Sequence, residues 1–202
     1  MFEAGTQVMK QAHALRLAVV AGVLTIATIG LLGYRLAGQA SAPDAGMPPG
    51  LLSSPQLTPE QAQAEVEAIM ALTLDDLDGR PQAIAQWRGK ILVINYWASW
   101  CKPCVEEMPA FASLQSRHAG QGVQFVGIGI DDAEKMRRFV QVTPVSYPLL
   151  VAGDAASQTP GLQVKALPYT VIIGRDGRFE SSRLGRLDEA KLEPILRQLI
   201  AR

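Results

Sequence analysis

Two cysteines separated by two residues, Cys101 and Cys104, have the types and spacing that most directly indicate chemistry, and the 202-residue chain has no others. They follow an apolar run at Ile91–Trp97 that is typical of a buried strand, and they precede a segment, 103–118, with the apolar spacing of a helix. At the amino end of a helix, unpaired N–H groups and the helix dipole stabilise a thiolate. The spacing therefore predicts thiol–disulfide exchange.

The position of each cysteine predicts its role. Cys101 precedes the first helical turn and is expected to be exposed and ionised, whereas Cys104 lies one turn in and is expected to be partly covered. We therefore assign the attack on a disulfide to Cys101 and the resolution of the mixed disulfide to Cys104. Lys102 adds positive charge beside the attacking sulfur, and Pro103 fixes the backbone where a missing N–H does no harm.

Other uses of a cysteine pair are weaker. A C-x-x-C pair is half of a zinc site, but the two histidines, His13 and His118, are far from it in sequence, so we predict no metal site. A non-enzymatic metal carrier or assembly chaperone with Cys101 and Cys104 as soft ligands is the alternative from another functional class. An inert disulfide would not need a strand-to-helix junction. A peroxidase is not favoured because the sequence has no Thr-x-x-Cys arrangement.

The elements around the pair predict an α/β domain. A second apolar run, 123–130, ends at Asp131, and together with Ile91–Trp97 and the helix between them it forms a β-α-β unit with parallel strands. Before this unit, alternating leucines at 72–77 and an Asp78-Gly79 turn predict a hairpin that opens the domain.

The carboxyl-terminal part predicts three more elements. A helix is expected at 134–140, and the segments 170–173 and Phe179–Leu184 are expected to pair as a hairpin. A last helix is expected after Asp188, which would cap it, and Pro194 should make that helix kink or start late.

An apolar segment at 17–34 lies far before the cysteines. About 18 residues without a charge would form a helix roughly 27 Å long, close to the thickness of a bilayer core. Lys10 and Arg16 on its amino side favour an orientation with residues 1–16 in the cytoplasm and everything after the span exported. A signal peptide cleaved near Ala40 is the alternative, and it exports the same domain.

The region between this segment and the domain is compositionally distinct. Residues 35–59 are rich in Ala, Ser, Pro and Gly and predict a flexible linker, and a short helix capped by Thr58 is expected at 60–71. Basic and acidic residues number 19 each, so no net field would gather a nucleic acid, and we expect no nucleic-acid partner.

The cysteine region also resembles a known family. It runs Trp97-Ala98-Ser99-Trp100-Cys101-Lys102-Pro103-Cys104, then Glu107-Met108-Pro109, and later Leu167-Pro168-Tyr169-Thr170. This order and spacing over 72–202 is similar to TlpA/ResA-like membrane-anchored thiol:disulfide oxidoreductases of the thioredoxin superfamily. The resemblance implies a thioredoxin-like domain at 72–202, with an N-terminal β-hairpin extension and a transmembrane helix before it.

The resemblance implies catalytic roles for two more residues. Pro168 matches the family's cis-proline, which lies beside the cysteines and leaves neighbouring backbone free to pair with an extended substrate. Glu107 matches an acidic residue near the pair, and because it follows Cys104 by three residues it shares that helical face; we predict that it transfers protons. Glu106 is expected to be solvated. Asn95 replaces the buried Asp of thioredoxin, and an amide cannot exchange a proton at neutral pH.

Five residues are expected to contact substrate. Trp100 would form an apolar rim for a docked polypeptide, and the others are Lys102, Pro103, Leu167 and Tyr169. Tyr169 stands where the family often has Thr.

The resemblance finally implies a location and partners. The protein is expected in the inner membrane, with its catalytic domain in the periplasm or otherwise on the extracytoplasmic face. It is expected to need no cofactor and to reduce disulfides of exported proteins, such as clients of cytochrome c maturation or metal-site assembly. A membrane dithiol electron donor of the DsbD/CcdA kind is expected to supply electrons. A disulfide-forming oxidase is the alternative direction, because reduction potentials of such proteins span ~150 mV.

Overall fold

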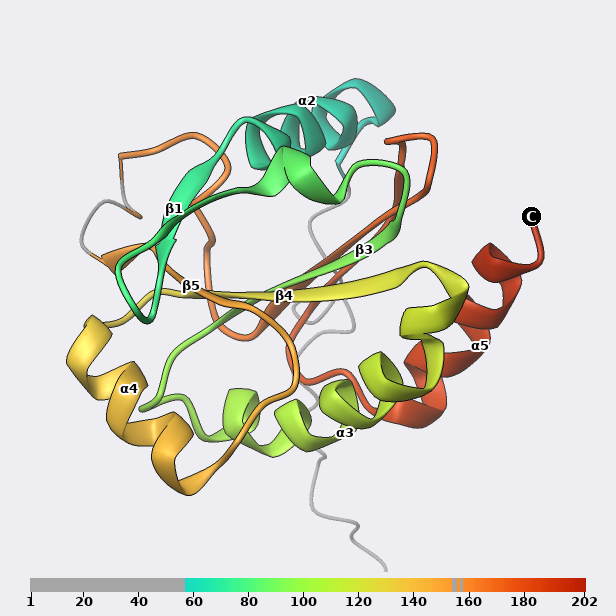
Figure 1. Cartoon of the computed structure of the whole chain (residues 1–202). Coiled ribbons are helices and arrows are strands. Elements are labelled where there is room, and N and C mark those ends of the chain that lie inside the picture. The colour runs from blue at the N-terminus through green and yellow to red at the C-terminus, as the bar shows by residue number, and fades with distance from the viewer. Residues whose placement is uncertain (1–56, 154–155, 157) are drawn as a thin grey trace, which may run out of the picture. The chain divides into compact units, whose positions relative to one another are not determined.

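A seven-stranded mixed sheet forms the centre of the domain (Figure 1). The structure is a computed structural model that describes residues 57–153, 156 and 158–202. The strands, in the spatial order β2-β1-β5-β4-β3-β6-β7, are β1 (Thr73–Asp76), β2 (Pro81–Ala83), β3 (Ile91–Trp97), β4 (Val123–Gly129), β5 (Leu149–Val151), β6 (Tyr169–Ile173) and β7 (Phe179–Leu184). The helices are α2 (Pro59–Met70), α3 (Lys102–His118), α4 (Ala133–Val142) and α5 (Glu189–Ile200), with short 3-10 turns η1 (Ile84–Trp87) and η2 (Ala119–Gln121).

The two most apolar strands occupy the middle of this sheet. β3 and β4 run parallel, from Ile91 opposite Val123 to Trp97 opposite Gly129, with α3 connecting them. Every residue of both strands is buried. The predicted β-α-β unit is therefore confirmed, and it follows from strands that are apolar on both faces and must be covered on both.

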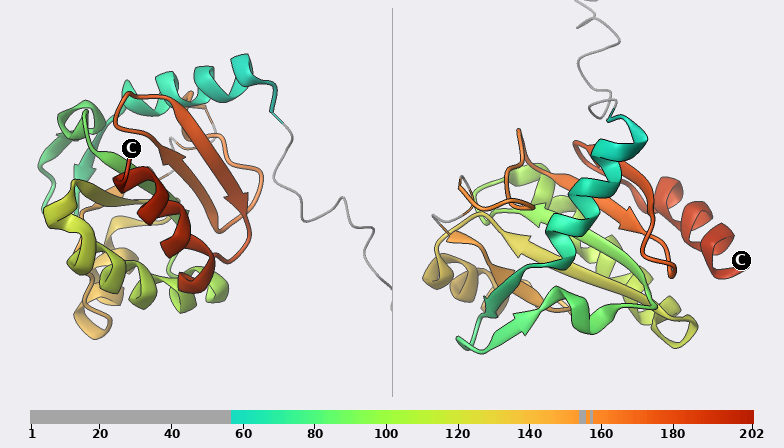
Figure 2. Two further views of the ribbon diagram at one scale, coloured as in Figure 1. Left: turned by 90° about the vertical axis from the view of Figure 1, so that its right-hand side faces the viewer. Right: turned by 90° about the horizontal axis from the view of Figure 1, so that it is seen from above.

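Helices cover both faces of the sheet. Figure 2 shows α2 on one face and α3 and α5 on the other, and α4 lies on the same side as α3 in Figure 1. Along β3, the side chains of Val93 and Trp97 belong to a core cluster that includes the buried face of α3. Those of Ile94 and Tyr96 belong to a second core cluster, which includes the buried face of α2. The strand's period of two therefore assigns successive side chains to two separate cores.

The helix that follows the cysteines has one buried face. Met108, Phe111 and Leu114 are almost entirely buried, as their spacing predicts, and the ring of Phe111 lies 5.4 Å from that of Phe125 on β4. This contact fixes α3 against the central strands and so places its amino end at the carboxyl end of β3.

The elements at the start of the domain match their predictions closely. Thr58 caps α2, and a reciprocal capping box with Gln61 is present. β1 and β2 form the predicted antiparallel hairpin. The sequence does not predict β5, which is only three residues long and pairs parallel to β4 and antiparallel to β1. A run this short carries no periodicity that could reveal it.

The last helix differs from its prediction. α5 begins at Glu189, directly after Asp188, and continues through Pro194. Of the two effects expected of this proline, a kink or a late start, the late start is therefore wrong. Pro194 is exposed, while Leu192 and Leu196 on the opposite side are fully buried, and their burial outweighs one lost backbone hydrogen bond. Asp188 occupies the N-cap position, but its side chain accepts no hydrogen bond from the helix, so the predicted side-chain cap is absent.

The expected cytoplasmic residues 1–16, the expected span 17–34 and nearly all of the expected linker 35–59 lie outside the described residues. In the part of the chain that the structure describes, none of the helices has the length and apolarity to cross a bilayer.

The packing of α3 predicts the cost of one truncation. Replacing Phe111 with Ala should lower the free energy of unfolding by about 3–5 kcal/mol, because the change removes a buried ring and leaves a cavity. Urea denaturation of the purified protein would measure this loss. Ser116→Ala, at an exposed position of the same helix, should change stability by no more than about 0.5 kcal/mol. Equal losses in the two variants would contradict the role given to the Phe111 ring.

Candidate active site

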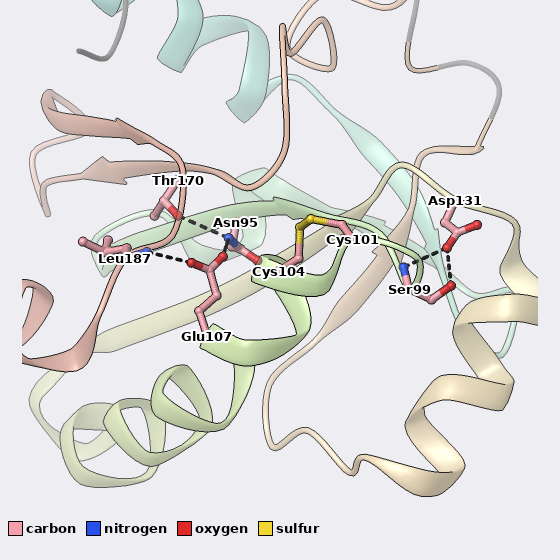
Figure 3. The surroundings of a disulfide bond; sticks show 8 residues. All are labelled: Asn95, Ser99, Cys101, Cys104, Glu107, Asp131, Thr170 and Leu187. Atoms are coloured by element: carbon pink, nitrogen blue, oxygen red, sulfur yellow. Dashed lines mark hydrogen bonds between the residues drawn. A yellow bond between two sulfur atoms is a disulfide. The ribbon is translucent and has the colours of Figure 1, made fainter. Parts of the chain in front are cut away.

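The two cysteines form a disulfide at the amino end of α3. Cys101 is the N-cap residue of the helix and Cys104 lies in its first turn, with 5.3 Å between their Cα atoms. The backbone N–H of Cys101 donates to the carbonyl of Ala98, so a tight turn joins the end of β3 to the helix. The strand-to-helix junction predicted for the pair is present (Figure 3).

The exposure of Cys101 corrects one expectation. The sequence predicts an exposed Cys101, but the residue is only 6% exposed, and Cys104 is completely buried rather than partly covered. Both residues belong to the core cluster of α3, and the sulfur of Cys101 is bonded to that of the buried Cys104. The oxidised pair is therefore packed into the protein, with Cys101 as its more accessible member.

A buried carboxylate lies beside the pair. Glu107 is 1% exposed, and its two oxygens are bound separately. Oε1 accepts a hydrogen bond of 2.8 Å from the side-chain amide of Asn95 on β3, and Oε2 accepts one of 2.9 Å from the backbone N–H of Leu187 (Figure 3). Three segments that are distant in sequence therefore converge on one carboxyl group.

The environment of Glu107 suits a group that exchanges protons. Burial raises the pKa of Glu107 to about 7, although the hydrogen bonds from Leu187 and Asn95 oppose that rise. A carboxyl group with such a pKa is present in both protonation states near neutral pH. By contrast, Glu106 is exposed, as predicted, and pairs with Arg186 at 3.1 Å.

Asn95 has a structural role that its sequence position does not reveal. Its amide nitrogen also donates to the hydroxyl of Thr170 on β6, at 3.2 Å, so Asn95 links β6 to α3 through Glu107. The strand register places Asn95 directly opposite Thr170. The amide thus orients the carboxylate instead of exchanging a proton itself. Sequence reasoning missed the parts of Thr170 and Leu187, because only tertiary packing brings them to the site.

The proline loop is also in the predicted place. The peptide bond between Leu167 and Pro168 is cis, Pro168 is buried, and its carbonyl accepts from the N–H of Gly185 at 2.8 Å. Leu167 packs partly against the cluster that contains both cysteines. The loop therefore contains the expected cis-proline and packs against the core cluster that includes both cysteines.

Three of the five residues that were expected to contact substrate lie together at the surface. Trp100 is 68% exposed, and Lys102 and Pro103 are exposed beside it, so these three form the accessible rim of the pair. Tyr169 does not belong there. Its ring lies on the α2 face of the sheet, stacked 5.9 Å from the ring of Tyr96, and its hydroxyl donates to Glu65 at 3.1 Å. Strand alternation turns Tyr169 away from the face that holds Thr170, which corrects its predicted role.

Comparison with known proteins decides the family. The model of the AhpC/TSA family matches residues 66–181, which is more than half of the chain. The chain belongs to the AhpC/TSA family. Thioredoxin-like protein YneN of Bacillus subtilis is 27% identical over 180 residues, covering 87% of this chain and 95% of YneN. Thiol-disulfide oxidoreductase ResA of Bacillus cereus is 29% identical over 126 residues, covering 61% of this chain and 72% of ResA.

A solved structure supports the same grouping. The crystal structure of a thioredoxin-related protein from Neisseria meningitidis serogroup B superposes with a TM-score of 0.56 at 28% identity, covering 64% of this chain and 99% of that chain. The protein is thus a TlpA/ResA-like member of the thioredoxin superfamily, with a mixed α/β thioredoxin-like fold. Together with the Cys101–Cys104 pair, these relatives identify it as a thiol:disulfide oxidoreductase.

The raised pKa of Glu107 predicts how stability depends on pH. The unfolded chain loses this proton near pH 4.5 and the folded chain near pH 7, so the folded state is progressively disfavoured between those values as pH rises. Glu107→Gln should remove this effect. Between pH 5 and 8 the parental chain should lose about 2 kcal/mol more unfolding free energy than the variant.

Urea denaturation of both oxidised proteins across this pH range would measure the difference. Glu106→Gln is the matched control, because it removes a neighbouring carboxylate that is exposed, and its pH profile should follow that of the parent. Parallel profiles for the parent and Glu107→Gln would show that the carboxyl group is not buried in the manner described.

Proposed function

We propose that the protein is anchored in the cytoplasmic membrane by residues 17–34 and uses its periplasmic domain to reduce disulfides in exported proteins. The observation that carries this proposal is the Cys101–Cys104 disulfide at the start of α3, with the buried carboxyl group of Glu107 one turn beyond it. A C-x-x-C pair beside a proton-exchanging group can complete both steps of disulfide reduction.

The reaction follows from the positions of these groups. In the reduced protein the Cys101 thiolate attacks a client disulfide, which forms a mixed disulfide and releases one client sulfur as a thiolate. Cys104 then attacks the Cys101 sulfur, which releases the second client sulfur and closes the ring. Glu107 accepts the proton of the Cys104 thiol and returns it to the leaving sulfur. Two electrons and the proton of Cys104 thus pass to the client, and the client thiolate released first takes its proton from solvent. A membrane dithiol donor of the DsbD/CcdA kind then restores the pair.

The rim of the site supports a polypeptide client. Trp100 offers a large exposed apolar surface next to Cys101, and exposed tryptophans of this kind are favoured at protein-binding surfaces. Leu167, which precedes the cis-proline and is half-buried, is positioned to supply backbone groups to an extended segment of the client. We propose clients of cytochrome c maturation or metal-site assembly as examples of such polypeptides.

The charges around the rim are balanced. Arg186 binds both Glu106 and Asp188 at the mouth of the site, while Lys102 lies 3.9 Å from Glu106. Exposed pairs of this kind add little stability. These ion pairs leave little net charge at the rim. Selection of a client would therefore rest on the apolar surface of Trp100 and on backbone pairing more than on charge.

Two cysteine variants test the assigned roles. Cys101→Ser should reduce insulin disulfides at less than about one hundredth of the parental rate, because the attacking sulfur is absent. Cys104→Ser should instead accumulate a mixed disulfide with the client, because the resolving sulfur is absent. Insulin turbidity and non-reducing electrophoresis would measure the two effects.

Parental activity in Cys101→Ser would refute the assignment. A glutathione equilibrium that lies as far toward the dithiol as that of strong disulfide-forming oxidases would reverse the proposed direction.

The location is tested separately. The full chain should sediment with membranes, resist extraction by carbonate and yield to detergent, because a helix at 17–34 would be embedded in lipid. An external protease should digest its domain in spheroplasts but not in intact cells. Deletion of residues 1–34 is the matched control, and it should leave the domain soluble in the cytosol. Recovery of the parental domain as a soluble periplasmic protein starting near residue 41 would show cleavage in place of anchoring.

A further inference from the structure

A second buried carboxylate holds the loop that carries Cys101. The segment between β3 and α3 contains Ser99 and Trp100, and it lies against the residues that follow β4. Asp131, which is 8% exposed, accepts a hydrogen bond of 2.8 Å from the backbone N–H of Ser99 and one of 2.6 Å from its hydroxyl, both at Oδ2 (Figure 3). The proposed reaction does not use this carboxylate.

The strand register explains why these residues meet. Trp97 is opposite Gly129 at the end of the β3–β4 ladder, and the N–H of Ile130 donates to the carbonyl of Trp97 at 2.8 Å. Two residues beyond the end of each strand lie Ser99 and Asp131. The carboxylate therefore continues the pairing of β3 with β4 into the catalytic loop, after backbone pairing has ended.

Asp131 also connects this loop to α4. Its other oxygen accepts from the N–H of Asp132 at 2.8 Å, and Asp132 caps α4 by accepting from the N–H of Lys135. Burial alone would raise the pKa of Asp131, but the hydrogen bonds from Ser99 lower it below its ordinary value. The group is therefore an anion at neutral pH, and hydrogen bonds to an anion are stronger than those between neutral groups.

We propose that Asp131 is a positioning residue that, through Ser99, holds Cys101 against Cys104 in the reduced protein and thereby favours closure of the disulfide. The stability of an intramolecular disulfide depends on the effective concentration of one thiol at the other. A loop tethered two residues before Cys101 samples fewer positions and keeps that concentration high. The proposal concerns the redox pair itself, so it holds whichever client or compartment the protein serves.

Equilibration with glutathione tests the proposal on the detergent-solubilised full chain. Two glutathione thiols reduce the Cys101–Cys104 disulfide to two thiols, and one glutathione disulfide forms. The ratio of oxidised to reduced protein at known concentrations of glutathione thiol and glutathione disulfide therefore gives the equilibrium constant. In Asp131→Asn the single remaining side-chain oxygen cannot serve both Ser99 and Asp132. We expect this variant to shift the equilibrium about tenfold toward the dithiol.

Two further variants separate tethering from charge. Asp132→Asn removes the same charge from the adjacent residue, and because Asn is an equally good N-cap it should retain α4 and change the equilibrium less than about twofold. Ser99→Ala removes only the hydroxyl bond without any change of charge, and it should shift the equilibrium about threefold in the same direction as Asp131→Asn. Ser99→Ala also keeps the test decisive should Asp131→Asn fail to fold.

The outcomes discriminate clearly. A lower melting temperature with an unchanged glutathione equilibrium in Ser99→Ala and Asp131→Asn would overturn the proposal, because the contact would then be structural only. Equal shifts in Asp131→Asn and Asp132→Asn, with none in Ser99→Ala, would also overturn it and leave charge as the cause. Insulin reduction by the parental chain is a separate measurement, so failure of this inference would not be confused with failure of the proposed function.

Discussion

The site depends on keeping one carboxyl group, that of Glu107, out of water. Removing a carboxyl group from solvent without partners would be strongly unfavourable, and here Asn95 and the backbone of Leu187 each bind one of its oxygens. These partners require β3, α3 and the segment before α5 to be in their final positions at once. The buried polar group therefore couples the proton transfer that we propose for Glu107 to correct folding of the whole core.

The sheet separates this chemistry from a second, purely structural core. On β6, Thr170 faces Asn95 and the cysteine side, whereas its neighbour Tyr169 stacks on Tyr96 under α2 and binds Glu65. Because adjacent residues of a strand point in opposite directions, the residue directly after the cis-proline contributes to packing and not to the rim of the site. The accessible rim is consequently narrow and consists mainly of the exposed tryptophan and the first turn of α3.

Local features of the chain were enough to predict most elements and the reacting atoms. Apolar runs located β3 and β4, turn residues located both hairpins, and the C-x-x-C spacing at a strand-to-helix junction identified Cys101 and Cys104. Such features are readable because propensity, period and capping act within a few residues. A strand of three residues such as β5 is too short to show a periodic pattern. The continuity of α5 through Pro194 was not predicted either, because it follows from burial of the opposite face of the helix.

The surroundings of the pair follow from three-dimensional packing instead. Asn95 orients Glu107 from 12 positions away, Leu187 binds the same carboxyl group from 80 positions away, and Asp131 holds Ser99 across 32 positions. The direction of Tyr169 likewise depends on which face of the sheet α2 covers. These contacts form because the packing of apolar faces encloses particular polar groups together. The pattern of residue types along the chain does not show which polar groups will meet in this way.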